Sequence, residues 1–424
     1  VFEYPLQGGS TELQRGTAVV GSWVARSFYD PSLRPGQDPP PPPDLLGQTG
    51  SPVTRARVCG SCHNLSNPLL SYDSVRGEYW PNPDGQPAPN FEADAANGMF
   101  PIERTFDEWR LSTYANGGVY APQFAGKKPD GVVETCQDCH MPRTTGAAAD
   151  AAFNPLQRDC QTTGCLPQHN FIGANTWLPG LLQDPAWRLN ASGESSYLAA
   201  NKSAAQSFLS KAAAIAVQLD PPAAGGRRVL VTVTNQTGHK LPTGYPEGRR
   251  MWIHLQAYDA AGSLVYESGA YDSQTGLLDT GPSTKVYEAK LGLSSNLARF
   301  LHLPAGESFF FSLNNYWIKD NRIPPRGYTQ ANFDRDGLRP VGYTYPDGAY
   351  FDQTEYTVPV SAVRVVAALY YQTASKEYID FLAQLGGIDG QALDALRQTK
   401  PGQPVLVTRG WSPDFPRYLP VIHR

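Results

Sequence analysis

The chain has 424 residues, 17% of them charged, and a formal net charge of -4 at pH 7. A charge this small does not favour nucleic acid or an anionic membrane as a partner, and no apolar run approaches the 18 residues of a membrane-spanning helix. The length allows two or three domains, and the 40 glycines, 38 prolines and 11% aromatic residues indicate a loop-rich protein with β structure.

Residues 1–50 are a predicted N-terminal arm. Five consecutive prolines beginning at Pro39 form a stiff polyproline segment, which favours a spacer over the alternative of a docking arm. The sequence opens without methionine, and we expect a mature chain whose signal peptide has been removed.

Residues 51–190 are the predicted cofactor-binding domain, because they contain one short pattern twice. Cys-x-x-Cys-His occurs as Cys59, Cys62 and His63, and again as Cys136, Cys139 and His140. One such match is expected by chance roughly once in several hundred chains of this composition. Two thiols at this spacing add across the vinyl groups of a haem, and the adjacent histidine is delivered to the iron. Each motif therefore predicts one covalent haem c.

Two other kinds of site also use Cys-x-x-Cys. A thioredoxin-like redox pair has this spacing, and so has half of a zinc site. Neither needs a histidine directly after the second cysteine, and the redox motif belongs to a βαβ setting that is not visible here. Zinc remains the main alternative to haem.

The two remaining cysteines lie close together, at Cys160 and Cys165. Their spacing suits a small disulfide loop, whereas a third haem site would need a histidine where Leu166 stands. A disulfide agrees with an oxidising compartment, and covalent haem is attached outside the cytoplasm. We therefore expect an extracellular or periplasmic protein.

The second axial ligand of each iron decides whether a haem only passes electrons or also binds substrate. His169 follows the predicted disulfide loop and is predicted to be a ligand; the alternative is a surface histidine. His239 stands in a rigid turn after a strand of alternating valines, from which it is expected to reach a haem of the preceding domain. The alternative for His239 is a turn histidine bonded to nearby backbone. His254 and His302 are not favoured as ligands.

The rest of the chain changes its hydrophobic period. Residues 191–213 have helical spacing and predict one helix. Residues 214–375 predict an antiparallel β-sandwich, and residues 376–424 a C-terminal helix with an extended tail. The strand candidates are 214–220, 227–235, 251–259, 263–268, 283–293, 307–318 and 362–372. The expected fold class is mixed: a loop-rich, partly helical domain with two covalent haems, followed by this sandwich.

Several stretches resemble the multihaem cytochromes c of anaerobic and metal-respiring prokaryotes. The resemblance is carried by CQDCHMP, HNFIGAN and TFDEWRLSTYANGG, and by NQTGHKLPTGYPEGRRMWIHLQAYDAAGSLVYESG and DNRIPPRG of the β domain, and covers residues 51–375. It implies a distal-ligand role for His169 in its H-x-F-x-G setting. Many of those cytochromes carry four or more haems and a histidine where this chain has Tyr114, and some polymerise into conducting filaments.

These observations predict an electron-transfer protein rather than an enzyme. Two low-spin haems with bis-histidine ligation would exchange electrons with redox partners, for which other cytochromes are expected, and the chain is a candidate subunit of a homopolymer. A haem reductase or peroxidase with one open iron is the alternative, with Tyr114 and Lys240 as candidates to line its pocket. A third hypothesis gives the β domain a binding role of its own.

Overall fold

The computed structural model describes most of the chain after residue 51. The predicted N-terminal arm lies outside the described residues. The described residues are 52–83, 98–147, 157–162, 166–168, 170–182, 194–385, 388–399 and 402–412. They form a mixed fold in which antiparallel sheets predominate and helices are mostly short. No helix among them is both long and apolar enough to span a membrane.

The N-terminal part is built from short helices and small sheets around the two Cys-x-x-Cys-His motifs. Its helices are α3 (Pro52–Gly60), α5 (Thr105–Arg110), α6 (Pro122–Ala125), α7 (Cys136–His140), α8 (Trp177–Leu182) and α9 (Glu194–Leu209). A three-stranded sheet has the order β2 (Glu78–Pro81), β1 (Ser66–Asp73), β3 (Met99–Pro101). Two-residue strands pair as β4 (Val119–Tyr120) with β5 (Val132–Val133), β6 (Arg143–Thr144) with β9 (Leu166–Pro167), and β7 (Gly146–Ala147) with β8 (Gln157–Arg158).

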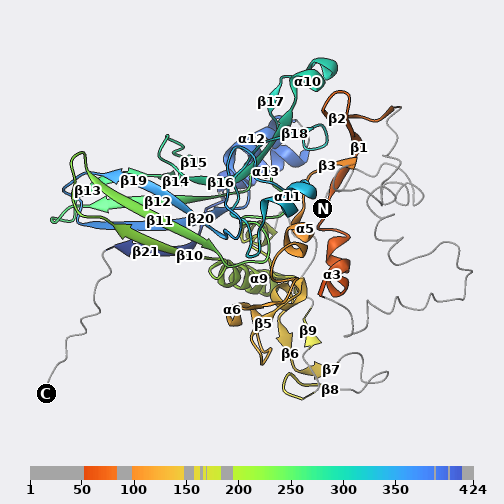
Figure 1. The fold of residues 1–424 in the computed structure, drawn as a ribbon, viewed down its shortest axis with the longest axis horizontal. Coiled ribbons are helices and arrows are strands. Elements are labelled where there is room, and N and C mark those ends of the chain that lie inside the picture. The colour runs from red at the N-terminus through yellow and green to blue at the C-terminus, as the bar shows by residue number, and fades with distance from the viewer. Residues whose placement is uncertain are drawn as a thin grey trace, which may run out of the picture.

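The C-terminal part is the predicted antiparallel sandwich. One sheet has the order β10 (Ala213–Leu219), β11 (Arg227–Asn235), β19 (Phe351–Val358). The other runs β17 (Gly306–Glu307), β16 (Val286–Leu293), β12 (Arg250–Tyr258), β20 (Arg364–Gln372), β21 (Val405–Ser412), with β13 (Leu264–Ser268) on β12 and β18 (Tyr316–Asp320) on β16. Around it lie β14 (Tyr271–Asp272), β15 (Leu277–Leu278), α10 (Ser295–Leu301), α11 (Gln330–Arg335), α12 (Lys376–Gln384) and α13 (Ile388–Thr399). Figure 1 shows these sheets extending away from α3, α5 and α6.

The core of the sandwich lies between its two sheets. Every second residue of β11, from Val229 to Val233, is fully buried and packs with inward residues of the facing sheet such as Ile253 and Leu369. Each such side chain contributes about 1.5–3 kcal/mol through the apolar surface that it removes from water. The alternation of valine with threonine in the sequence therefore identifies the buried face of β11.

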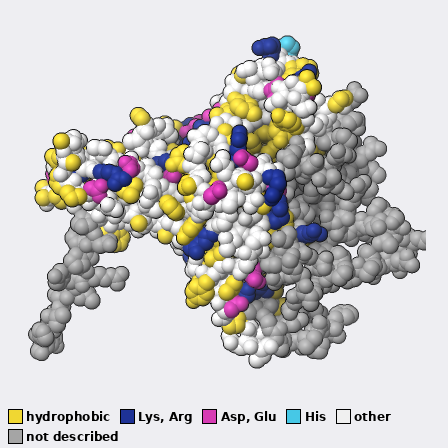
Figure 2. Space-filling model, viewed as in Figure 1, with side chains coloured by type: hydrophobic (Ala, Val, Ile, Leu, Met, Phe, Trp, Pro, Cys, Tyr) yellow, Lys and Arg dark blue, Asp and Glu magenta, His cyan; other side chains and the backbone are white. Residues whose placement is uncertain are grey.

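The predicted elements agree with the structure except near the end of the sandwich. The helix predicted at 191–213 is α9, and the strand predicted at 307–318 is wrong for most of its length, because β18 begins only at Tyr316. The sheet also extends beyond the predicted boundary at 375, since β21 pairs with β20. On the face seen in Figure 2, Lys and Arg side chains are interspersed with Asp and Glu, in keeping with the small net charge.

Candidate haem-binding site

The second motif forms the short helix α7, whose start is fixed by one of its own residues. Asp138, an x position of the motif, accepts a hydrogen bond from the backbone of Thr135 (3.0 Å), and the Thr135 side chain accepts one from the Asp138 backbone (3.3 Å). This capping box satisfies two donors at the helix start. Arg143 also donates to Asp138 (2.5 Å). The helix therefore holds the two motif cysteines and His140 in a defined arrangement.

The two motifs lie side by side, although 73 residues separate them. Helix α3, which carries Cys59, packs beside α7. A hydrogen bond between the thiols of Cys59 and Cys136 lowers the pKa of Cys59 to about 7 and raises the pKa of Cys136. None of the four motif cysteines is paired in a disulfide. The fold thus brings both pairs of cysteines to one region of the molecule.

His140 of the second motif faces His239 of the β domain. Their ring centres are 6.3 Å apart and their planes differ by 25°. Burial lowers the pKa of His140 to about 4 and also lowers the pKa of His239, so both rings are neutral at physiological pH. A neutral imidazole is the form that binds a metal. The sequence predicted these two residues as ligands but could not pair them.

Both rings are oriented through the same nitrogen. Nδ1 of His140 donates to the carbonyl of Ile172 (2.5 Å), and Nδ1 of His239 donates to the carbonyl of Lys240 (3.0 Å). Among the described residues, Nε2 of neither ring has a hydrogen-bond partner. A metal-binding histidine characteristically donates one ring N–H to a carbonyl and offers the other nitrogen to the metal. Both rings therefore carry their proton on Nδ1, which leaves Nε2 unprotonated as a metal ligand must be.

The spacing of the two rings can be compared with what a haem requires. Two imidazoles on opposite sides of one metal, each bonded at about 2.0 Å, have ring centres roughly 6 Å apart. The observed 6.3 Å fits this arrangement. Phe208 of α9 packs edge-on against His140 (5.1 Å between centres) and against Phe124 (5.5 Å), which gives the site an aromatic wall. The residues present therefore fit a haem with two histidine ligands.

The first motif has a more open setting. The side chain of His63 is 62% exposed, and its Nδ1 lies 3.2 Å from Oε1 of Glu103. The hydrogen bond to Glu103 raises the pKa of His63. His169 lies outside the described residues, so its role as a distal ligand stays a prediction. Within the described part of the chain, no group of three or more His, Cys, Asp or Glu is arranged to hold a bare metal ion.

Three further predictions concern residues away from the paired rings. Cys160 is disulfide-bonded, and its predicted partner Cys165 lies outside the described residues. His254 lies on β12, where its Nε2 is 2.8 Å from Glu267. His302 ends α10 in the left-handed conformation. Neither histidine is placed beside the motifs.

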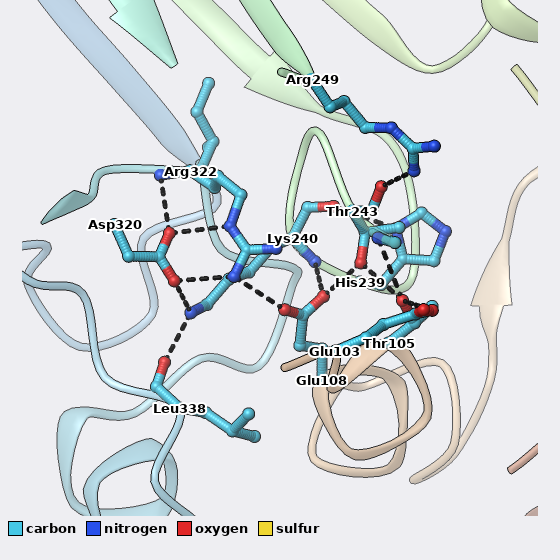
Figure 3. A network of polar contacts seen from close by, with 12 residues as sticks. Glu103, Thr105, Glu108, His239, Lys240, Thr243, Arg249, Asp320, Arg322 and Leu338 are labelled. Atoms are coloured by element: carbon cyan, nitrogen blue, oxygen red, sulfur yellow. Dashed lines mark hydrogen bonds and ion pairs between the residues drawn. The ribbon is translucent and has the colours of Figure 1, made fainter. Parts of the chain in front are cut away.

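A polar network connects the first motif to the turn that carries His239 (Figure 3). From Glu103, which contacts His63, hydrogen bonds pass through the hydroxyls of Thr105 (3.0 Å) and Thr243 (2.9 Å). Thr243 in turn donates to Glu108 (2.6 Å), a fully buried residue of α5. No sequence pattern indicates this network, because its members lie in segments far apart along the chain.

The network ends in a buried cluster of charges beneath the turn. Nζ of Lys240 donates to Oδ2 of Asp320 (2.6 Å) and to the carbonyl of Leu338 (2.6 Å). Arg322 binds the two oxygens of Asp320 (2.8 and 2.7 Å) and lies 3.4 Å from Glu108. Burial of this kind is tolerated only where charges are paired and hydrogen-bonded. Lys240 is thus occupied by an ion pair and does not present its ammonium group to an open haem pocket.

Tyr114 also joins the two parts of the molecule. Its side chain is 1% exposed, and its hydroxyl donates to the backbone carbonyl of Gln236 (2.7 Å). Gly238, two residues further, lies so close that an added Cβ would be 3.0 Å from Trp109 and 3.2 Å from Tyr114. Tyr114 therefore packs under the turn that carries His239 and connects the N-terminal part with the β domain.

Comparison with known proteins gives limited information. No protein-family model matches the chain, and no curated protein matches it. Among solved structures, the chain is similar to a penta-heme cytochrome c552 from Thermochromatium tepidum, with 15% sequence identity and a TM-score of 0.43. The alignment covers 95% of this chain and 66% of that chain. A likeness at this level does not establish a shared fold.

Proposed function

We propose that the chain is a two-haem c-type cytochrome of the multihaem kind, and that its function is electron transfer. The observation that carries the proposal is the pair of neutral rings of His140 and His239, 6.3 Å apart, beside a Cys-x-x-Cys-His motif. A haem bound here supplies the one-electron chemistry of its iron.

The residues of the second motif divide the work. Cys136 and Cys139 would tether the haem through thioether bonds, which would fix its position and prevent its loss. His140 and His239 would be the two histidine ligands of the iron through Nε2, because a carbonyl holds Nδ1 of each ring. With two histidine ligands in place, no position is left for a substrate, which favours electron transfer over catalysis.

The adjacency of the motifs supports electron exchange within the chain. The sulfur atoms of Cys59 and Cys136 lie within hydrogen-bond reach of each other, so both tethers would start from neighbouring points. His63 would be the proximal ligand of the haem on Cys59 and Cys62, with His169 as its proposed distal ligand.

The setting of the protein is part of the proposal. Covalent haem together with the disulfide at Cys160 supports an extracellular or periplasmic location. We propose other cytochromes as redox partners. We also propose that copies of the chain assemble into an electron-conducting filament, because the chain has few haems for its length.

Absorption spectroscopy of the purified protein tests the function. We expect two covalent haems per chain, low-spin in the ferric form and unchanged by carbon monoxide after reduction with dithionite. His239→Ala should open one iron and bind one carbon monoxide per chain, whereas the control His254→Gln should bind none. If His239→Ala stays blind to carbon monoxide, the ligand assignment is wrong.

Binding of one carbon monoxide per chain by the unaltered protein would support the alternative function, a haem enzyme such as a reductase or peroxidase, in place of a simple carrier.

A further inference from the structure

We infer that Glu108 is the positioning residue that holds His239 at the second haem. The inference rests on the proposed function, because it concerns the ligand of that haem. Glu108 belongs to α5 in the N-terminal part, while His239 belongs to the β domain. The proposed ligand and the motif that binds the haem therefore come from different domains.

The contacts of Glu108 are concentrated on one oxygen. Oε2 accepts a hydrogen bond from the backbone N–H of Lys240 (3.0 Å) and another from the hydroxyl of Thr243 (2.6 Å). The N–H of Lys240 belongs to the peptide bond that directly follows His239. Holding that peptide in place also restricts the position of the next carbonyl, that of Lys240. This carbonyl accepts the hydrogen bond from Nδ1 of His239.

Tyr114 also bonds to this turn from the N-terminal part, but at Gln236, three residues before His239. The bonds to the carbonyl of His239 itself do not connect the two parts. The His239 carbonyl accepts from the side chains of Asn235 (2.7 Å) and Thr237 (3.0 Å), both of which belong to the same domain as His239. These bonds shape the turn but do not attach it to the N-terminal part. Glu108 does attach it, and Figure 3 shows its carboxylate between Thr243 and Arg322.

The charge of Glu108 is suited to this role. Its side chain is fully buried, and an ionised carboxylate forms hydrogen bonds about twice as strong as a neutral acceptor. Arg322, 3.4 Å from Oε1, compensates the negative charge. Removal of the carboxylate would leave the Lys240 N–H buried without its acceptor and Arg322 with one fewer partner.

Three variants of the full haem-loaded protein test the inference. Glu108→Ala removes both hydrogen bonds. We expect it to bind up to one more carbon monoxide per chain than the unaltered protein does. Glu108→Gln keeps an oxygen that can accept both bonds, and should bind less carbon monoxide than Glu108→Ala. Asp107→Ala is the matched control, because Asp107 is the neighbouring buried acid of α5 but pairs with Arg110.

The outcomes separate a positioning role from a structural one. A purely structural role would lower the melting temperature of both alanine variants without changing carbon monoxide binding, and that result overturns the inference. Equal carbon monoxide binding by Asp107→Ala and Glu108→Ala overturns it as well. If Glu108→Ala does not fold, Thr243→Val removes one of the two bonds and must bind carbon monoxide partially; no binding overturns the inference.

His239→Ala, measured in parallel, distinguishes failure of the inference from failure of the proposed function. If His239→Ala opens an iron and Glu108→Ala does not, only the role of Glu108 is wrong. If His239→Ala also leaves both irons closed, the assignment of His239 is wrong and the inference about Glu108 falls with it.

Discussion

Glu247 should make the protein less stable at neutral pH than at acidic pH. Its side chain is 3% exposed, and burial raises its pKa from 4.5 to about 8, with the charge of Glu307 acting in the same direction. The folded state therefore keeps the carboxyl protonated at pH 7, while the unfolded chain ionises it. Asn314 donates to Oε1 of Glu247 (3.1 Å), and its own carbonyl oxygen is buried without a partner among the described residues.

The sign and size of the effect follow from the two pKa values. A group whose pKa is raised by folding contributes its full stability below the unfolded value, here 4.5, and loses it as the pH rises through about 8. At pH 7 the pH lies about 2.5 units above the pKa of this group in the unfolded chain. Each unit corresponds to about 1.4 kcal/mol, so keeping the carboxyl protonated in the folded state costs about 3 kcal/mol. Glu247→Gln removes this cost.

Chemical denaturation at a series of pH values measures the effect. We expect Glu247→Gln to raise the free energy of unfolding by about 3 kcal/mol at pH 7 and by close to nothing at pH 4. Glu355→Gln is the control with the opposite sign, since the hydrogen bond from Arg228 lowers the pKa of Glu355. A change on Glu247→Gln that is the same at every pH, or a loss of stability at pH 7, would refute the reasoning.

Three further substitutions test the packing around the candidate site. Phe208→Ala removes the ring that packs on His140, and should lower the free energy of unfolding by about 2 kcal/mol in denaturant titration; no loss would mean that the contact is not formed. Gly238→Ala places a methyl group 3.0 Å from Trp109, and should both destabilise the protein by about 1–3 kcal/mol and open an iron to carbon monoxide, whereas a neutral result would contradict the close packing of the turn. Tyr114→Phe removes one buried hydrogen bond and should cost about 1 kcal/mol, while keeping the absorption spectrum unchanged.

The strands that alternate apolar and polar residues could be predicted from the sequence, but β19 could not. Its inward positions include Asp352, which is 4% exposed and accepts hydrogen bonds from Tyr287 (2.9 Å) and Tyr343 (2.6 Å) and pairs with Lys285 (2.9 Å). A charged residue on the buried face breaks the hydrophobic alternation on which strand prediction depends. The partners that make it tolerable come from distant segments.

The wrong strand at 307–318 has a different cause. The aromatic run in this segment favours a strand by propensity alone. In the structure, Phe309 packs against Tyr378 and Phe381 (5.3 and 5.5 Å between ring centres), and Phe310 also packs against Phe381 (4.8 Å). These rings cover α12 instead of joining the sheet. Tertiary packing overrides the local preference here.

The candidate site, too, could be predicted from the sequence only in part. Spacing alone identifies the motif residues, because thioether chemistry requires their order in the chain. Pairing His140 with His239 required coordinates, since 99 residues separate them. The role of Glu108 required coordinates for the same reason: in the sequence it is an ordinary acid of a short helix, and only its contact with the Lys240 peptide connects it to a ligand.

A crystal structure of the haem-loaded protein with anomalous data at the iron edge tests the central claim most directly. We expect two iron peaks per chain, one of them between His140 and His239 at about 2.0 Å from each Nε2. An iron peak bound by His140 but not by His239, or a peak at the zinc edge on the motif cysteines, would contradict the account.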